Sequence, residues 1–289
     1  MAKGYRPEQQ EDGTMAMEMD FGAQSDTGCV RENNEDSYLA APEMGLFVLS
    51  DGMGGLESGE VASHLAVDAV LAHCREAEAN PFLPLTGESI DGVSDASNRL
   101  ASAIRLANKV VHRAAQANAA RKAVGAMGAT VVAVRFAGER MSLAHVGDSR
   151  AYRLRGENFE QLTQDHSFVA EQMRQGNMTQ QEAGESALQS VLIRALGVDT
   201  DVDVDVTEEL VMENDTVLLC SDGLTRELSD RQIAAVLGDA DDAQEAADRL
   251  VDLAKQAGGG DNITAIVVRR APQPAGVFAR IGRWFRDSA

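Results

Sequence analysis

Two strongly apolar runs of this chain end in the same tripeptide, Ser-Asp-Gly. The first run ends at Asp51 and Gly52, and the second ends at Asp222 and Gly223. A short apolar run before a turn signal is typical of a buried strand, and glycine lets the backbone turn sharply. A carboxylate at the end of a buried strand costs free energy unless a partner compensates its charge. The repeat therefore predicts a fold that brings both aspartates together around cations.

Three further aspartates lie at comparable places. Asp261 follows three consecutive glycines and precedes an apolar strand, and Asp36 and Asp148 lie at strand edges. For any single Asp-Gly pair, a simple turn is the alternative explanation. Repetition at the ends of apolar strands favours a shared site instead.

The chemistry of these side chains indicates a hard divalent cation. Carboxylates together with a glycine carbonyl suit Mg²⁺ or Mn²⁺, whereas zinc prefers His or Cys. The histidines show no ligand spacing and are interpreted as structural, with His166 as the one candidate for a functional role. A two-metal carboxylate site can activate water and polarise a phosphoryl oxygen. Arg31, close to Asp36, offers a planar guanidinium that matches phosphate; an ordinary surface arginine is the alternative.

Bulk properties exclude some classes of partner. The net charge of −20 leaves no basic surface for nucleic acid. The three cysteines form no metal or redox motif, which favours a reducing compartment. The start of the chain is polar and does not resemble a signal peptide, and no apolar run approaches the roughly 20 residues needed to cross a bilayer. We therefore expect a cytoplasmic protein, monomeric and not associated with membranes.

Apolar periodicity predicts an α+β domain. Residues 1–13 are expected to form a flexible extension, residues 14–270 one domain, and residues 271–289 a proline-containing linker with a short basic amphipathic helix. Helices are expected in pairs rather than one after each strand, which is an α+β pattern. Besides the strands already mentioned, the sequence predicts a strand near 15–23, helices near 67–74 and 100–111, strands at 130–134, 141–146 and 151–154, a helical stretch at 167–187, an exposed strand at 201–206, helices at 230–237 and 243–256, and a last strand at 263–268.

The C-terminal helix carries the chain's one tryptophan. Its apolar residues share one face and arginines lie elsewhere; the apolar face comprises Val277, Phe278, Ile281, Trp284 and Phe285. Three roles stay open. The helix docks on its own domain, binds a groove of a partner, or lies on a membrane surface, for which the acidic body is unfavourable.

Seven short motifs occur in a fixed order along the chain. They are Arg31-Glu32-Asn33-Asn34-Glu35-Asp36-Ser37, Ser50-Asp51-Gly52-Met53-Gly54-Gly55, Gly128-Ala129-Thr130, His145-Val146-Gly147-Asp148-Ser149-Arg150, Leu162-Thr163-Gln164-Asp165-His166-Ser167, Ser221-Asp222-Gly223-Leu224 and Gly260-Asp261-Asn262-Ile263-Thr264. In this order they resemble the metal-dependent serine/threonine protein phosphatases (the PPM family, type 2C) in their bacterial form. The resemblance covers roughly residues 14–270.

The resemblance implies a fold and a set of roles. The fold is two packed antiparallel β-sheets flanked by helix pairs, a four-layer α-β-β-α sandwich. Asp51 would bridge two Mg²⁺ or Mn²⁺ ions, the Gly52 carbonyl would bind one, and Asp222 with Asp261 would bind the other. The remaining roles follow the same pattern: Asp36 would act through metal-bound water, Asp148 would bind a third, weaker metal, and Arg31 would hold the substrate phosphate.

The chain departs from the family pattern at three places. Met53 stands where many eukaryotic members have a histidine that protonates the leaving group, and methionine cannot donate a proton. Bacterial members similar to this chain imply a metal-bound water in that role. Residues 186–190, here named the flap, lack the usual His-Pro and Arg-Asn, and Ile193 replaces the usual threonine.

The function predicted from the sequence is a Mg²⁺/Mn²⁺-dependent phosphoprotein phosphatase. A metal-bridging hydroxide would attack the phosphorus of phosphoserine or phosphothreonine directly, since no motif supplies a Cys or Ser nucleophile. Phosphorylated proteins, including substrates of Ser/Thr kinases and the kinases themselves, are the expected partners. The alternatives are a non-catalytic phosphoprotein-binding relative and a small-molecule phosphatase on the same fold.

Overall fold

The computed structural model describes residues 19–54, 58–120 and 127–270. The expected N-terminal extension, the start of the first expected strand and the amphipathic C-terminal helix lie outside the described residues. Among the residues that are described, no helix is both long enough and apolar enough to cross a membrane.

Two antiparallel sheets form the centre of the molecule. The first has the strand order β1-β11-β10-β7-β8, and the second has the order β2-β3-β5-β6-β9 with the short β4 paired to β3. The strands are β1 (Met19–Asp26), β2 (Asp36–Ala41), β3 (Leu46–Met53), β4 (Gly128–Ala129), β5 (Val131–Ala137), β6 (Arg140–Val146), β7 (Arg150–Arg155), β8 (Asn158–Gln161), β9 (Asp205–Leu210), β10 (Thr216–Cys220) and β11 (Ile263–Arg270).

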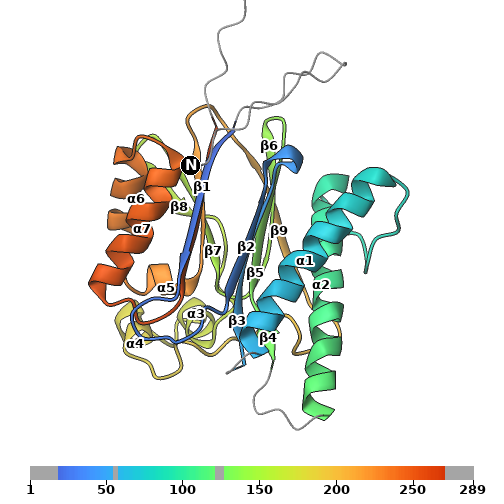
Figure 1. The fold of residues 1–289 in the computed structure, drawn as a ribbon, viewed down its shortest axis with the longest axis horizontal. Coiled ribbons are helices and arrows are strands. Elements are labelled where there is room, and N and C mark those ends of the chain that lie inside the picture. Colours follow the sequence, from blue (N-terminus) through green and yellow to red (C-terminus); the bar gives the residue numbers. More distant parts are fainter. Residues whose placement is uncertain (1–18, 55–57, 121–126, 271–289) are drawn as a thin grey trace, which may run out of the picture.

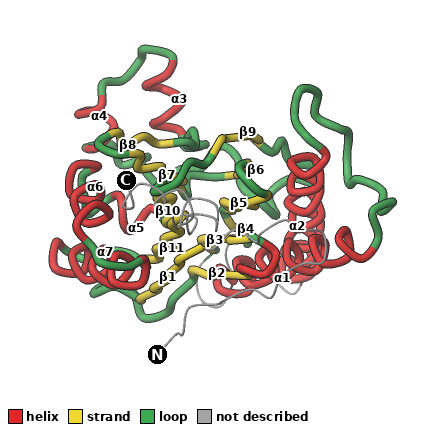
Figure 2. Tube along the Cα trace, turned by 90° about the horizontal axis from the view of Figure 1, so that it is seen from above, coloured by secondary structure: helices red, strands yellow, loops and turns green. Residues whose placement is uncertain are grey.

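A pair of helices covers the outer face of each sheet (Figure 1). The long helices α1 (Ser58–Ala79) and α2 (Asp95–Ala120) pack on the β2-β3-β5-β6-β9 sheet, and α6 (Asp230–Asp239) and α7 (Ala243–Ala257) pack on the other. Figure 2 shows the resulting four layers end on. The predicted four-layer α-β-β-α sandwich is therefore confirmed.

Three apolar clusters hold these layers together. One lies between α1, α2 and their sheet, one lies under α6 and α7, and the third fills the space between the two sheets. Phe47 and Leu49 of β3 and Leu219 of β10 belong to the third cluster. The apolar runs that precede the two Ser-Asp-Gly tripeptides thus face each other across the centre of the molecule.

Two expected elements differ in the structure. The predicted strand at 201–206 is largely a loop, and β9 begins only at Asp205, where pairing with β6 starts. Val202, Val204 and Val206 still pack against the α1–α2 side of the core. The alternation of valine and aspartate therefore marks which side chains are buried, although most of this segment pairs with no strand that the structure describes. The predicted helical stretch at 167–187 is two short helices, α3 (Phe168–Arg174) and α4 (Gln180–Gly184), separated by a turn at Gly176.

The loops at one end of the two sheets position the predicted aspartates. Asp36 opens β2, Asp51 lies near the end of β3, and Asp148 lies in the turn between β6 and β7. Asp222 is the first residue of the short helix α5 (Asp222–Thr225), which directly follows β10, and Asp261 lies two residues before β11. Both sheets therefore contribute carboxylates to one site.

Candidate metal centre

Asp36 and Asp51 come from neighbouring strands of one sheet. They lie directly opposite each other in the antiparallel pair β2–β3. The next residue, Gly52, donates its N–H to the Glu35 carbonyl at 3.0 Å. A Cβ at Gly52 would lie 2.0 Å from the Gly59 carbonyl oxygen of α1, so only glycine fits between β3 and this helix.

The Asp36 carboxylate is buried, and the opposite sheet holds one of its oxygens. Its Oδ2 accepts hydrogen bonds from Ser221 Oγ at 2.8 Å and from Thr264 Oγ1 at 2.6 Å. Burial, opposed in part by these hydrogen bonds, raises the pKa of Asp36 to about 7. Its Oδ1 is buried without a hydrogen-bond partner among the described residues. A buried, unpartnered carboxylate oxygen requires a ligand or a proton.

Asp222 and Asp261 lie together because two loops of the other sheet are in close contact. A Cβ at Gly223 would lie 2.0 Å from the Asn262 carbonyl oxygen, so these loops leave no room for a side chain between them. Asp261 Oδ1 accepts from the Asn262 N–H at 2.9 Å, which orients this carboxylate. Asp222 Oδ1, like Asp36 Oδ1, is buried and has no partner among the described residues.

The carboxylates influence one another strongly. Removal from water, followed by the charges of Asp36, Asp222, Asp148 and Asp261, raises the pKa of Asp51 well above its ordinary value. Burial, with a contribution from Asp222, raises the pKa of Asp148 to about 7. All five predicted aspartates therefore lie in one electrostatic cluster, as the sequence analysis expected.

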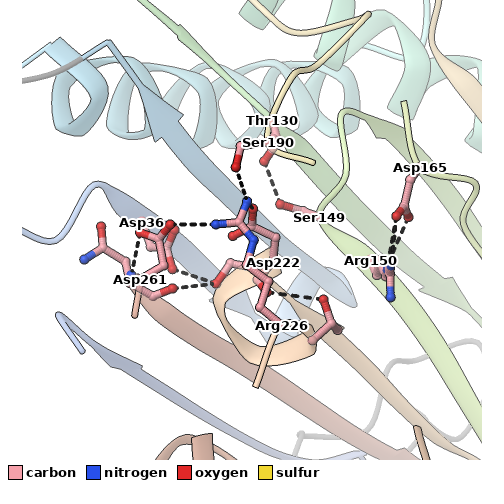
Figure 3. Close-up of polar contacts among 12 residues, drawn as sticks. Asp36, Thr130, Ser149, Arg150, Asp165, Ser190, Asp222, Arg226 and Asp261 are labelled. Atoms are coloured by element: carbon pink, nitrogen blue, oxygen red, sulfur yellow. Dashed lines mark hydrogen bonds and ion pairs between the residues drawn. The ribbon is translucent and has the colours of Figure 1, made fainter. Parts of the chain in front are cut away.

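Backbone contacts fix the position of Asp51 more than side-chain contacts do. Its N–H donates to Thr130 Oγ1 at 3.0 Å, and its carbonyl accepts from the Thr130 N–H at 2.8 Å. Thr130 Oγ1 also contacts Ser149 Oγ at 2.6 Å, which links this strand to the residue after Asp148 (Figure 3). The Asp51 carboxylate is thus held in place without using its oxygens.

Two arginines border the cluster. The predicted residue Arg31 donates to Asp261 Oδ2 at 2.9 Å, and its side chain is half exposed. Arg226 forms ion pairs with Asp222 and Asp261. Arg226 is not among the site residues predicted from the sequence; its position four residues after Asp222, one helical turn away, is the available signal.

The donor set fits divalent cations. It consists of oxygens alone, two of them buried and unpartnered, and several of the carboxylates would hold protons near neutral pH without a compensating charge. Mg²⁺ and Mn²⁺ prefer such ligands. The residues present therefore fit the metals that the family resemblance implies.

A cleft of about 380 Å³ opens beside the end of β3, and none of the five site aspartates is among its lining residues. Met53, two residues after Asp51, lines it together with Leu192, Ile193 and Val198. Asp199, Asp201 and Asp203 also line it. The predicted departures Met53 and Ile193 therefore lie in one cleft, beside the segment that follows the flap.

His166 lies outside the carboxylate cluster. Its ring stacks on His145 with centroids 4.8 Å apart, and its Nδ1 accepts from the Gly147 N–H at 3.0 Å. Its Nε2 lies 3.3 Å from Asp205 Oδ2. Burial and the neighbouring His145 lower the pKa of His166 to about 4, so the ring is neutral and contacts the backbone beside Asp148.

The molecule is an α-β-β-α sandwich, and one end of its sheets carries a cluster of carboxylates that fits divalent metal ions. This fold and this site together are those expected of a metal-dependent phosphatase. The protein phosphatase 2C family model matches residues 30–258. The chain therefore belongs to the protein phosphatase 2C family.

Curated relatives agree with this assignment. The chain is 38% identical over 247 residues to the serine/threonine protein phosphatase PstP of Mycobacterium tuberculosis, a match that covers 86% of this chain but 44% of PstP. It is 34% identical over 249 residues to the serine/threonine phosphatase stp of Listeria innocua, covering 85% of this chain and 94% of stp. The chain thus spans less than half of one relative and nearly all of the other.

Solved structures support the same fold. The catalytic domain of PstP, in a complex with two manganese ions, has a TM-score of 0.72 and 34% sequence identity to this chain. The match covers 88% of this chain and 99% of that domain.

Proposed function

We propose that this protein is a Mg²⁺/Mn²⁺-dependent phosphatase that hydrolyses phosphoserine and phosphothreonine in proteins. The observation that carries the proposal is the carboxylate centre, in which Asp36 and Asp222 each hold a buried oxygen without a partner among the described residues. The curated relatives, which are serine/threonine phosphatases, support the substrate class.

Each ligand has a place in this proposal. Asp51 would bridge two ions and the Gly52 carbonyl would bind one of them, whereas Asp222 and Asp261 would bind the other. Asp36 would act through water, and Asp148 would hold a third, weaker ion. Bound ions would activate a water as the nucleophile and polarise the phosphoryl group.

The protein groups account for the rest of the chemistry. Arg31 lies beside Asp261 with half of its side chain exposed, so its guanidinium can reach a phosphate from solvent. Burial raises the pKa of Cys74 to about 11 and that of Cys220 to about 12, so neither thiol is a nucleophile at neutral pH. The third thiol, Cys29, is exposed and donates its Sγ–H to the Lys255 carbonyl at 3.6 Å, at the end of α7. The proposed route is therefore direct attack by water without a covalent enzyme intermediate. Since Met53 has no proton to give, the leaving oxygen would take its proton from water.

The proposed partners are phosphorylated proteins, among them Ser/Thr kinases and their substrates, and the protein would act as a cytoplasmic monomer. A phosphatase of small molecules on the same fold is separated from this proposal by substrate assays. A non-catalytic phosphoprotein-binding relative is disfavoured, because every predicted ligand is present.

The test is hydrolysis of a phosphothreonine peptide by the full chain with and without Mn²⁺. We expect turnover that depends on the metal and falls at least about 100-fold in Asp222→Ala. Metal-independent turnover, or full activity of Asp222→Ala, would contradict the mechanism. Asp239→Ala, a change at the far end of α6, is the matched control.

A further inference from the structure

Arg226 joins the carboxylate centre to the flap. Its side chain forms an ion pair with Asp222, and its NH1 lies 3.0 Å from Asp261 Oδ2. Its NH2 donates to Ser190 Oγ of the flap at 3.1 Å (Figure 3). One guanidinium thus contacts two of the proposed metal ligands and the flap at the same time, and the proposed chemistry assigns it no role.

The contacts of Arg226 use oxygens that a metal would need. Asp222 Oδ2 and Asp261 Oδ2 are its partners, and both belong to carboxylates that would bind one ion. A guanidinium and a divalent cation on the same two carboxylates repel each other. The Arg226 side chain is 32% exposed, so it can move toward solvent without breaking the core.

The flap depends on few other contacts. Its turn is closed by local hydrogen bonds, Gln189 N–H to the Ser186 carbonyl at 3.3 Å and Val191 N–H to the Leu188 carbonyl at 3.0 Å. Leu188 is 45% exposed and does not anchor the flap in the core. Just after the flap, the Val191 carbonyl accepts from the Phe168 N–H of α3 at 2.7 Å, which anchors this end of the segment. The hydrogen bond from Arg226 to Ser190 is the contact that ties the flap itself to the carboxylates.

Resting on the proposed function, we propose that Arg226 is a tethered counter-cation that couples metal binding to the flap. Before a metal binds, its guanidinium neutralises Asp222 and shares Asp261 with Arg31, and it holds the flap through Ser190. When a divalent ion takes the two carboxylates, the guanidinium leaves them and its hydrogen bond to Ser190 is lost. Arg226 thereby lowers the affinity for metal and makes the flap mobile only in the metal-loaded protein.

Isothermal titration calorimetry of the metal-stripped full chain with MnCl₂ tests whether Arg226 lowers the affinity for metal. Removing the positive charge in Arg226→Gln should tighten Mn²⁺ binding about tenfold, and Arg226→Lys should stay near wild type because the charge remains. Arg231→Gln, which removes an exposed arginine from the first turn of α6, is the matched control and should bind Mn²⁺ like wild type.

Hydrogen exchange of the flap amides tests whether metal binding releases the flap. In the wild type, exchange of the amides of flap residues 186–190, and of Val191, whose N–H bonds to the Leu188 carbonyl, should accelerate when Mn²⁺ is added. In Arg226→Gln, Arg226→Lys and Ser190→Ala it should already be fast and insensitive to Mn²⁺. Ser190→Ala should also keep the Mn²⁺ affinity within about twofold of wild type, because the ion pairs remain.

The outcomes separate this inference from the proposed function. If the wild type binds no Mn²⁺, the proposed function fails. If the wild type binds Mn²⁺ but Arg226→Gln binds it no more tightly, or if the wild-type flap exchanges at the same rate with and without Mn²⁺, the role of Arg226 is wrong. Thermal unfolding of each variant shows whether it is folded, and Arg226→Lys and Ser190→Ala keep the test decisive if Arg226→Gln is not.

Discussion

Asp36 and Asp51 lie directly opposite each other on adjacent antiparallel strands. Opposed residues of such a pair have neighbouring side chains, and like charges at these positions are destabilising. The pKa values of both carboxyls are raised, mainly because both are removed from water; the charge of Asp36 adds to the rise at Asp51, and the charges of Asp222 and Asp261 add to the rise at Asp36. The sheet is thus built with an electrostatic conflict that a bound cation would relieve.

This repulsion predicts that a variant without the Asp51 charge is more stable without metal but less active. Asp51→Asn removes one charge and keeps the shape, so the metal-free protein should melt about 3–5 °C higher at pH 7.5, while Mn²⁺-dependent turnover falls at least about 100-fold. Calorimetric melting of the metal-stripped variant and peptide assays check both effects. Asp68→Asn, at an exposed position of α1, is the control and should change neither the melting temperature nor the turnover. An unchanged or lower melting temperature for Asp51→Asn would contradict the predicted repulsion.

The raised pKa values also predict how the stability of the metal-free protein depends on pH. In the folded protein Asp36 and Asp148 keep a proton up to about pH 7, whereas an unfolded chain releases it near pH 4. Between these values the unfolded state binds fewer protons, so stability falls as the pH rises. We expect the metal-stripped protein to melt roughly 5 °C lower at pH 7.5 than at pH 5. Saturating Mn²⁺ should remove this loss; a melting temperature that rises over the same range without metal would refute it.

The hydroxyl of Thr264 is predicted to stabilise the ionised carboxylate of Asp36 and so to support metal binding. This buried side chain contacts Asp36 Oδ2 at 2.6 Å and Ser25 Oγ at 2.7 Å. Thr264→Val keeps the volume but removes both contacts, so it should cost about 1–3 kcal/mol of unfolding free energy and weaken Mn²⁺ binding, because the Asp36 carboxylate loses a donor. Thr264→Ser keeps the hydroxyl and should retain the Mn²⁺ affinity. Urea unfolding and Mn²⁺ titration of both variants measure the difference, and equal affinities would exclude this role.

The cleft beside Met53 predicts a preference among phosphopeptides. Its wall combines the apolar side chains of Ile193 and Val198 with the carboxylates of Asp201 and Asp203. The basic residue Arg194 also lines it, but its charge is paired with Asp205. Peptides with Lys or Arg near the phosphothreonine should therefore be hydrolysed about tenfold more efficiently, in kcat/KM, than peptides with Glu there. The double variant Asp201→Asn/Asp203→Asn should lose most of this preference, and added salt should weaken it. If the peptides with Glu are hydrolysed more efficiently, the cleft does not bind basic residues of the substrate.

Much of the fold could be predicted because its strands and helices are strongly patterned. The apolar runs before Asp51 and Asp222 are β3 and β10, and the two paired helices that follow each run are present. Strand pairing was less accessible, because the alternation at 201–206 indicates only which side chains are buried. The backbone partner that starts β9 at Asp205 comes from β6, distant in sequence.

The carboxylates of the site could be predicted for a different reason. A charged residue at the end of a buried strand is costly, and this cost marks it in the sequence. Arg226 carries only a weak signal, because an arginine four residues after an aspartate is also a common pattern on protein surfaces. Its role becomes visible only when the β10–α5 connection, the loop before β11 and the flap are seen to meet around it.

The hydrogen bonds from Ser221 and Thr264 to Asp36 have a mechanical consequence. Asp36 belongs to one sheet and its two donors to the other, so these bonds cross the plane along which the sheets would slide. A force that shears the two sheets would have to break both hydrogen bonds and would therefore act on the Asp36 carboxylate. Pulling experiments on this domain should therefore find resistance to shear at the proposed metal centre.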